Sequence, residues 1–301
     1  MVLGRVEGSI NSTFVALIPK DSSPASLSDY MPISLSDFVY KVISKMIANR
    51  IKGKYREHIS SEQFNFLKDR LITDVVGLVQ ESIHSANAHK KVGMFLKIDI
   101  KKAYDHVSWS FLRMVLIQIG LDWRVVQWIM GCVNSASFAI LVNGSPSNFF
   151  QAGRGLRPGC PLSPLLFLLV VDSLSRMIEK AKNDGKFRGF KVYVGSMITH
   201  LMFVDDIFIL GSGSLEEWRY MKSIVDMFCK ASGLDINLTK SCFVHINVED
   251  TILQEVVSLW GVASSPLDEG FKYLGYYLKA SIYIIVDWYW MLRKFEKRIN
   301  F

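Results

Sequence analysis

Two adjacent acids, Asp205 and Asp206, interrupt a stretch of apolar residues in the second half of the chain. The apolar runs Leu201–Val204 and Ile207–Leu210 flank them, which predicts two short strands around the acids. Burying a bare carboxylate costs several kcal/mol, and two neighbouring carboxylates also repel each other. The pair therefore either turns into water or binds a cation. Mg²⁺, a hard ion that prefers carboxylate oxygens, suits the second interpretation.

A third acid, Asp99, stands near the end of another apolar run, Phe95–Ile100. If the two segments pair in one sheet, Asp99 can face Asp205. Three carboxylates could then hold two metal ions about 3.5–4 Å apart, the arrangement used in nucleotidyl transfer. Both acids could equally well end ordinary strands, so the spacing alone leaves both interpretations open.

The composition limits the class of protein. The chain has 301 residues, of which 50% are hydrophobic, and this excludes wholesale disorder. At about 150 residues per domain, the length allows two domains or one large one. The formal net charge of +7 permits a nucleic-acid partner without establishing one.

Membrane segments and export signals are not expected. The apolar run Leu165–Val171 is far shorter than the roughly 20 residues of a membrane span. The cysteines are widely spaced and form no CxxC pair, which argues against a zinc site and a disulfide framework. We therefore expect a reduced intracellular protein, nuclear or cytoplasmic, that is not secreted and does not bind membranes.

The elements that must position the acids mix strands and helices without strict alternation, which predicts an α+β fold. Asn143-Gly144 between apolar runs predicts a hairpin, Ser108 and Ser163 are suitable helix N-caps, and Gly233 ends a helix. We expect helices over residues 39–55, 73–87, 108–119, 163–181 and 215–232. We expect strands over residues 13–18, 92–100, 138–142, 148–152, 199–210 (two strands) and 242–246. We expect loops over residues 20–37 and 153–161.

One predicted helix has a strongly basic polar side. Between Asp37 and Glu57 there is no acid, and the six basic residues are Lys41, Lys45, Arg50, Lys52, Lys54 and Arg56. They form either a solvated face or a surface that contacts a phosphate backbone.

The order of several short motifs resembles the reverse transcriptase of non-LTR retrotransposons, of the LINE type found in plants. The motifs are NSTFVALIPK, PISL, SEQFNF, LKIDIKKAYDHVSWSFL, GRGLRPGCPLSPLLF, HLMFVDDIFIL, SGLDINLTKS and YLGYYL. Each motif alone is weak, but the ordered set is specific and covers nearly the whole chain.

The resemblance implies a right-hand polymerase fold with fingers and palm, in which helices back an antiparallel palm sheet and the thumb is largely missing. Residues 1–90 would form a fingers-like region. Residues 91–245 would form the palm, with a fingers hairpin inserted at about 120–152. Residues 246–301 would form a primer-grip-like hairpin and the start of the thumb connection.

The resemblance also implies an activity, RNA-directed DNA synthesis that extends a primer 3′-OH with dNTPs. The cofactor would be two Mg²⁺ ions, with Mn²⁺ as a substitute, and the partners would be an RNA or DNA template with its primer. Two alternatives stay open. One is a truncated or inactive relic that still binds nucleic acid, and the other is a different template-directed nucleotidyl transferase.

By position, Asp99, Asp205 and Asp206 resemble the family's metal-binding catalytic carboxylates. Lys240 matches the lysine near the leaving pyrophosphate, although a solvated loop lysine explains it as well. Tyr104 matches an aromatic ring that excludes a ribose 2′-hydroxyl, although an ordinary core aromatic is the alternative.

Three basic residues match positions that face the incoming nucleotide, namely Arg157, Lys68 and Arg70. A capped turn and ordinary surface charge are the alternatives. Tyr273, Leu274 and Gly275 resemble the primer-grip hairpin, for which a plain buried hairpin is the alternative.

Four residues depart from the family pattern: Met31, Phe64, Asp69 and Pro158. Pro158 stands where the family has a Gln near the incoming nucleotide. Proline offers neither a side-chain amide nor a backbone N–H, so the substitution predicts less efficient catalysis.

Overall fold

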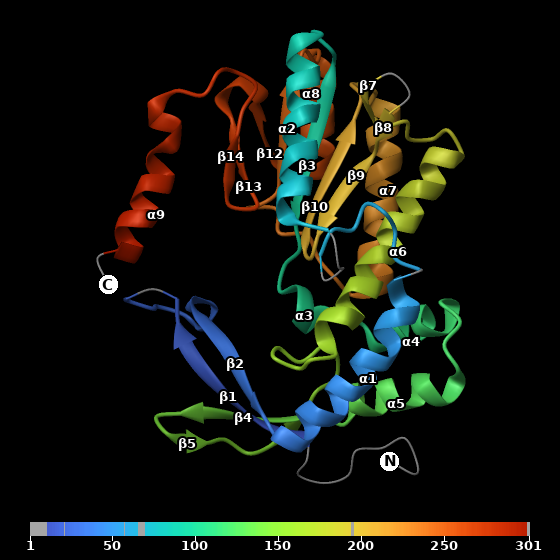
Figure 1. Ribbon diagram of the computed structural model, residues 1–301, viewed down its shortest axis with the longest axis vertical. Coiled ribbons are helices and arrows are strands. Elements are labelled where there is room, and N and C mark those ends of the chain that lie inside the picture. Colours follow the sequence, from blue (N-terminus) through green and yellow to red (C-terminus); the bar gives the residue numbers. More distant parts are fainter. Residues whose placement is uncertain (1–10, 21, 57, 66–69, 194–195, 300–301) are drawn as a thin grey trace. The chain divides into compact units, whose positions relative to one another are not determined.

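The computed structural model describes residues 11–20, 22–56, 58–65, 70–193 and 196–299 (Figure 1). Its helices are α1 Phe38–Arg56, α2 Ile72–Ala88, α3 Ala103–His106, α4 Trp109–Gln118, α5 Trp123–Asn134, α6 Ser163–Asn183, α7 Leu215–Ser232, α8 Asp250–Trp260 and α9 Tyr289–Ile299. Its strands are β1 Ser12–Pro19, β2 Tyr30–Ser36, β3 Gly93–Asp99, β4 Ser137–Val142, β5 Ser145–Pro146, β6 Phe150–Gln151, β7 Phe190–Tyr193, β8 Ser196–Ile198, β9 His200–Phe203, β10 Asp206–Gly211, β11 Cys242–Ile246, β12 Ala263–Pro266, β13 Phe271–Tyr273 and β14 Tyr276–Leu278. The α+β class is confirmed.

The chain divides into two compact units that are each built from three segments. The first unit comprises Met1–Lys68, Ile100–Met177 and Ile224–Ile236. The second unit comprises Asp69–Asp99, Ile178–Ser223 and Asn237–Phe301. Each unit has its own sheet, and each is described separately below.

The sheet of the first unit has the order β2-β1-β4-β5, and β6 also pairs with β4. Strand β1 runs antiparallel to β2 and parallel to β4. The loop expected over residues 20–37 is wrong where β2 lies, because every residue from Tyr30 to Ser36 pairs with β1. Pro32 hid this strand from sequence reasoning. A proline is tolerated there because β2 is an edge strand.

The predicted hairpin at Asn143-Gly144 is confirmed. Both residues have positive φ, 51° and 82°, as a two-residue turn of this kind requires. Of the strand expected over 148–152, only β6 is present, and a further short strand, β5, precedes this range; both pair with β4. Ser108 caps α4 as expected by accepting a hydrogen bond from the Phe111 N–H.

The sheet of the second unit has the order β12-β11-β3-β10-β9. Strand β3 lies between β10 and β11 and is antiparallel to both. The pairing of the two acid-bearing segments is therefore confirmed. One face of the sheet packs against Trp218 and Trp260, whose rings contact Phe243 of β11 edge to face.

On the other face of this sheet, the Phe208 ring lies 5.8 Å from Phe271 and 5.0 Å from Tyr273, between ring centroids. These two residues belong to the hairpin of β13 and β14. Its turn, Leu274-Gly275, has φ of 47° and 85°. The hairpin expected at this motif is thus present. None of the helices in the described ranges is long and apolar enough to cross a bilayer.

Candidate active site

Asp99 was expected to face Asp205, but the residue directly opposite it on the antiparallel strands β3 and β10 is Asp206. Residues that face each other across such a pair point their side chains to the same side of the sheet. Lys97 pairs with Phe208 two positions along the strands, so it lies on this side as well. The strand pairing thus gathers two carboxylates and a lysine at one end of the sheet.

Asp205 belongs to the two-residue turn that joins β9 to β10. Its neighbour Val204 has φ of 58°, a left-handed conformation that a β-branched residue rarely adopts. The turn was expected at the acid pair, but only Asp205 lies in it, and Asp206 begins β10.

The carboxylates perturb each other. Burial raises the pKa of Asp206 to about 6, and the charges of Asp205 and Asp99 contribute to the shift. Burial also raises the pKa of Asp205, and the charge of Asp99 adds to this rise. The Lys240 ammonium opposes both pKa shifts. The three predicted acids and Lys240 therefore form one electrostatic cluster.

The turn after α7, which contains Asn237 and Ser241, forms hydrogen bonds to Asp99. The Asn237 N–H donates to the Asp99 carbonyl at 2.8 Å, and its side-chain amide donates to Asp99 Oδ2 at 3.1 Å. The Asp99 N–H donates to Ser241 Oγ at 3.0 Å. Sequence reasoning quoted this motif but selected only Lys240 from it. The signal that it missed was an Asn three residues before that lysine.

The donor chemistry suits Mg²⁺, which takes carboxylate oxygens. In the part of the chain that the structure describes, no group of three His, Cys, Asp or Glu side chains is arranged to hold an ion by itself. Mg²⁺ at phosphate-transfer sites is usually bound through one or two carboxylates together with substrate phosphates. The carboxylates of Asp99, Asp205 and Asp206 are thus of the ligand type that this ion prefers.

Tyr104 lies on α3 in the first unit. Its ring stacks on Phe167 of α6, with 4.8 Å between the ring centroids. The Leu156 N–H donates to the Tyr104 carbonyl at 2.6 Å, which ties α3 to the loop that precedes α6. In that loop Gly155 has φ of 87°, and a Cβ there would lie 2.5 Å from the Asp105 carbonyl. Only glycine fits this close approach.

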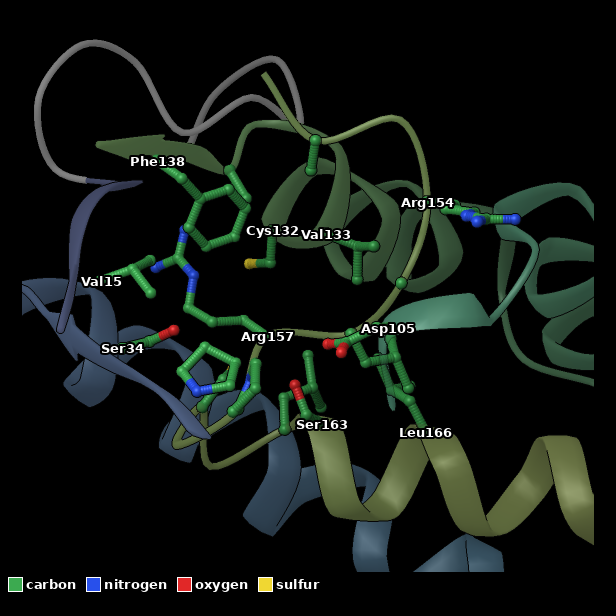
Figure 2. Close-up of a pocket in the computed structure, with 18 of the residues that line it drawn as sticks. Val15, Ser34, Asp105, Cys132, Val133, Phe138, Arg154, Arg157, Ser163 and Leu166 are labelled. Carbon is green, nitrogen blue, oxygen red and sulfur yellow. The ribbon is translucent and has the colours of Figure 1, made fainter. Parts of the chain in front are cut away.

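Arg157 borders a cavity of about 240 Å³ in the first unit (Figure 2). Its guanidinium carbon lies 4.7 Å from the centre of the Tyr40 ring and 5.3 Å from that of Phe138. Nη2 donates to the Asn11 carbonyl at 2.8 Å. Pro158, the departure from the family pattern, lines the same cavity.

The Arg157 side chain is 6% exposed, and burial lowers its pKa. No acid among the described residues pairs with it, and its Nε and Nη1 have no hydrogen-bond partner there. These two atoms are closed off from solvent, so the guanidinium is held by aromatic rings. A role for Arg157 at the nucleotide stays a prediction. So do the roles of Arg70, which lies half-buried before α2, and of Lys68, which is outside the described residues.

A groove of about 550 Å³ lies between the β13–β14 hairpin and α9 in the second unit. Basic and aromatic side chains line it: Lys272, Tyr276, Tyr277, Tyr289, Trp290, Arg293 and Lys294. Lys294 Nζ lies 4.8 Å from the centre of the Trp290 ring. This combination suits a nucleic-acid strand, since cations contact phosphates and rings contact bases or sugars.

Antiparallel strands that carry acids and are backed by helices fit a polymerase palm. Residues 18–278 match the family described as "Reverse transcriptase (RNA-dependent DNA polymerase)". The chain therefore belongs to the reverse transcriptase family, as its motifs indicated.

Curated relatives place it among the non-LTR retrotransposon proteins. The chain is 26% identical to the "Transposon TX1 uncharacterized 149 kDa protein" of Xenopus laevis over 280 residues, which cover 93% of this chain and 21% of the relative. It is 24% identical to the "Retrovirus-related Pol polyprotein from type-1 retrotransposable element R2" of Popillia japonica over 247 residues, 82% of this chain and 34% of the relative. The chain thus spans a fifth to a third of these relatives.

Solved structures support the fold. A telomerase of Candida tropicalis superimposes with a TM-score of 0.58 at 12% identity, over 80% of this chain and 42% of the telomerase. A telomerase of Candida albicans gives a TM-score of 0.53 at 12% identity, over 83% of this chain and 43% of that chain. The fingers-and-palm polymerase fold expected from the sequence is therefore confirmed.

Proposed function

We propose that this chain adds deoxynucleotides to a primer 3′-OH under the direction of an RNA or DNA template. One observation carries the proposal: Asp99 and Asp206 face each other on adjacent strands of a reverse transcriptase palm, with Asp205 in the adjoining turn. Side chains of like charge are costly to gather in a partly buried place. A ligand that carries positive charge offsets this cost.

Asp99 and Asp205 would hold divalent metal, Mg²⁺ or Mn²⁺, together with the phosphates of the substrate. Two such ions, when bound, lower the pKa of the attacking hydroxyl and stabilise charge on the leaving phosphate. Asp206 adds negative charge beside them, and its raised pKa favours metal binding at neutral pH over acid pH, where protons compete.

Lys240 would stabilise the charge that develops on the departing pyrophosphate. Its ammonium is close enough to the carboxylates to offset part of the rise in the pKa of Asp205 and Asp206. A positioned cation at a developing anion is among the strongest contributions that a protein makes to such a reaction.

Tyr104 would discriminate against ribonucleotides, and Arg157, Arg70 and Lys68 would act on the incoming nucleotide, as their positions in the family motifs suggest. For Tyr104 the proposal is supported by its stacking on Phe167, which fixes the ring. For Arg157 we propose an indirect role, because its guanidinium is buried between two rings.

The template and primer would be bound by basic and aromatic surfaces. One is the exposed side of α1, with Lys41, Lys45, Arg50 and Lys52. Another is the groove between the β13–β14 hairpin and α9. Phosphate contacts of this kind weaken as salt concentration rises.

The test is primer extension on poly(rA)/oligo(dT) by the purified chain with dTTP and Mg²⁺. Asp205→Asn should abolish extension, because it removes a charged metal ligand, while a matched change at the exposed Asp184 should not. Extension that survives Asp205→Asn contradicts the catalytic assignment.

A non-catalytic nucleic-acid-binding protein is the second candidate, and Pro158 is the residue that favours it. If Pro158 weakens nucleotide positioning, Pro158→Gln should increase extension, mainly through a lower KM for dTTP. One neutral hydrogen bond is worth about 0.5–1.5 kcal/mol, so the gain should be about threefold to tenfold. Salt-sensitive binding of primed template without extension, in both the parent and Pro158→Gln, would favour the second candidate.

A further inference from the structure

The turn after α7 holds Asp99 at three points rather than one. Asn237 bonds both the carbonyl and the carboxylate of Asp99, and Ser241 accepts from its N–H. The two ends of this turn are themselves joined, because the Ser241 N–H donates to the Asn237 carbonyl at 2.9 Å. The acid is therefore fixed from its backbone to its side chain by a single short segment.

The orientation of the Asn237 amide is determined by a second contact. Thr239 Oγ1 lies 2.8 Å from Asn237 Oδ1 and donates to it. The amide nitrogen must then be the atom that faces Asp99 Oδ2. Among the described residues, this amide makes the only hydrogen bond to the Asp99 carboxylate, which leaves Oδ1 available.

We infer that Asn237 is a positioning residue for Asp99, which it holds so that Oδ2 is occupied by the amide and Oδ1 takes the metal ion. This inference rests on the proposed function, because it assumes that Asp99 binds metal. A carboxylate that is already fixed in one rotamer loses little conformational entropy when the ion binds. A carboxylate that turns freely must be ordered by the ion itself.

The expected effect is measurable. Groups that hydrogen-bond a metal ligand typically change metal affinity or activity by about 10-fold to 100-fold when they are removed. Asn237→Ala should therefore raise the apparent Kd for Mn²⁺ by about 10-fold or more, measured by electron paramagnetic resonance of free Mn²⁺ on the full chain with dideoxy-terminated primed template and the same dTTP concentration in every sample. Its extension activity should recover at high Mg²⁺, so that the half-activating Mg²⁺ concentration rises while kcat is nearly retained.

Three further variants make the result specific. Asn87→Ala removes a comparable amide donor, which bonds the Ala280 carbonyl at 3.2 Å, and should leave the Mn²⁺ Kd unchanged. Thr239→Val removes only the hydroxyl that orients the Asn237 amide, at an exposed position, and should raise the Kd by about twofold. In an Asp99→Asn background, Asn237→Ala should have no additional effect on the Kd.

The outcomes separate this inference from the proposed function. If Asp99→Asn leaves the Mn²⁺ Kd unchanged, the metal site itself is wrong. If Asp99→Asn weakens Mn²⁺ binding while Asn237→Ala and Thr239→Val do not, only the positioning inference is overturned. If Asn237→Ala does not fold, Thr239→Val and its double variant with Asp99→Asn decide the question in the same way.

Discussion

Two charged sites, one in each compact unit, are compensated in opposite ways. In the first unit the Arg157 guanidinium is enclosed by the rings of Tyr40 and Phe138. In the second unit, three carboxylates lie together in a half-buried place, and burial and mutual repulsion raise the pKa of Asp205 and Asp206.

The two sites differ in what compensates the buried charge. Aromatic faces attract a cation and partly replace its water, so the protein compensates Arg157 internally. Aromatic faces offer no such attraction to a carboxylate. Lys240 and, at Asp206, Lys97 offset only part of the rise in the pKa of these acids, and under the proposed function a bound divalent cation would offset the rest.

The largest effect that tests this comparison is expected in the first unit. Arg157→Lys should lower the free energy of unfolding by about 1–3 kcal/mol, because an ammonium cannot stack as the planar guanidinium does. Chemical denaturation measures the loss, and Arg154→Lys at an exposed position of the same loop is the control. An unchanged stability would mean that the rings do not compensate the buried charge.

The exposed cations of the first unit should act differently from the buried one. Replacing Lys41, Lys45 and Lys52 together by Ala should reduce the slope of log affinity against log salt by about 2–3 for primed template, since each lysine releases close to one counterion. Filter binding at KCl concentrations from about 50 to about 300 mM measures this slope. An unchanged slope assigns these lysines to a solvated face, and Ala at the exposed Lys180, Lys186 and Lys230 should not change it.

The carboxylate cluster predicts an unusual pH dependence. The pKa of Asp206 is raised to about 6 from its ordinary value of 3.8, so between these pH values the folded chain binds a proton that the unfolded chain releases. Stability without metal should therefore fall as pH rises through this window. Asp206→Asn should raise Tm by a few degrees at pH 7.5 in EDTA and should not raise it at pH 4.

Two controls complete that experiment. Mg²⁺ should narrow the difference in Tm between the parent and Asp206→Asn at pH 7.5, because the ion offsets the repulsion. Asp184→Asn, at an exposed site, should not change Tm at either pH. A lower Tm for Asp206→Asn at pH 7.5 would contradict the view that the acids repel one another in the folded chain.

The smallest effect is expected at Tyr273, beside the cluster. Its hydroxyl is fully buried, has no hydrogen-bond partner among the described residues, and lies near the charge of Asp206, which together with burial raises its pKa. Tyr273→Phe removes an unpaired polar group and should leave the free energy of unfolding unchanged or increase it by up to about 1 kcal/mol. A clear loss of stability in chemical denaturation would reveal a partner for this hydroxyl.

The sequence predicted those parts of the fold that have a local cause. The Asn-Gly turn, the Ser108 cap and the long helix that begins at Ser163 follow from the conformational preferences of a few neighbouring residues. Strand β2 and helix α5 were missed. Strand β2 contains Pro32 and is specified by its pairing with β1. Helix α5 was missed although Val126, Ile129 and Met130 recur at helical spacing after the cap at Asp122.

The candidate site was predictable to the level of its charged residues. Acids that end apolar strands are visible in a sequence, and so Asp99, Asp205 and Asp206 were selected. Asn237 was not, because its bond to Asp99 spans 138 residues of chain and depends on the three-dimensional path of the turn. The burial of Arg157 between the rings of Tyr40 and Phe138 could not be predicted either, because these contacts also join residues that are distant in the sequence.

The left-handed conformation of Val204 has a consequence for how this sequence can change. Backbone strain of this kind costs of the order of 1–3 kcal/mol, and glycine at this position would release it. Glycine would also give the turn more conformational freedom, and the carboxylate of Asp205, which follows it, would be less well positioned. Valine at this position lowers folding stability but restricts the conformation of the turn. Mutations selected only for stability would therefore replace Val204 by glycine, whereas selection for catalysis would retain a residue that restricts the turn.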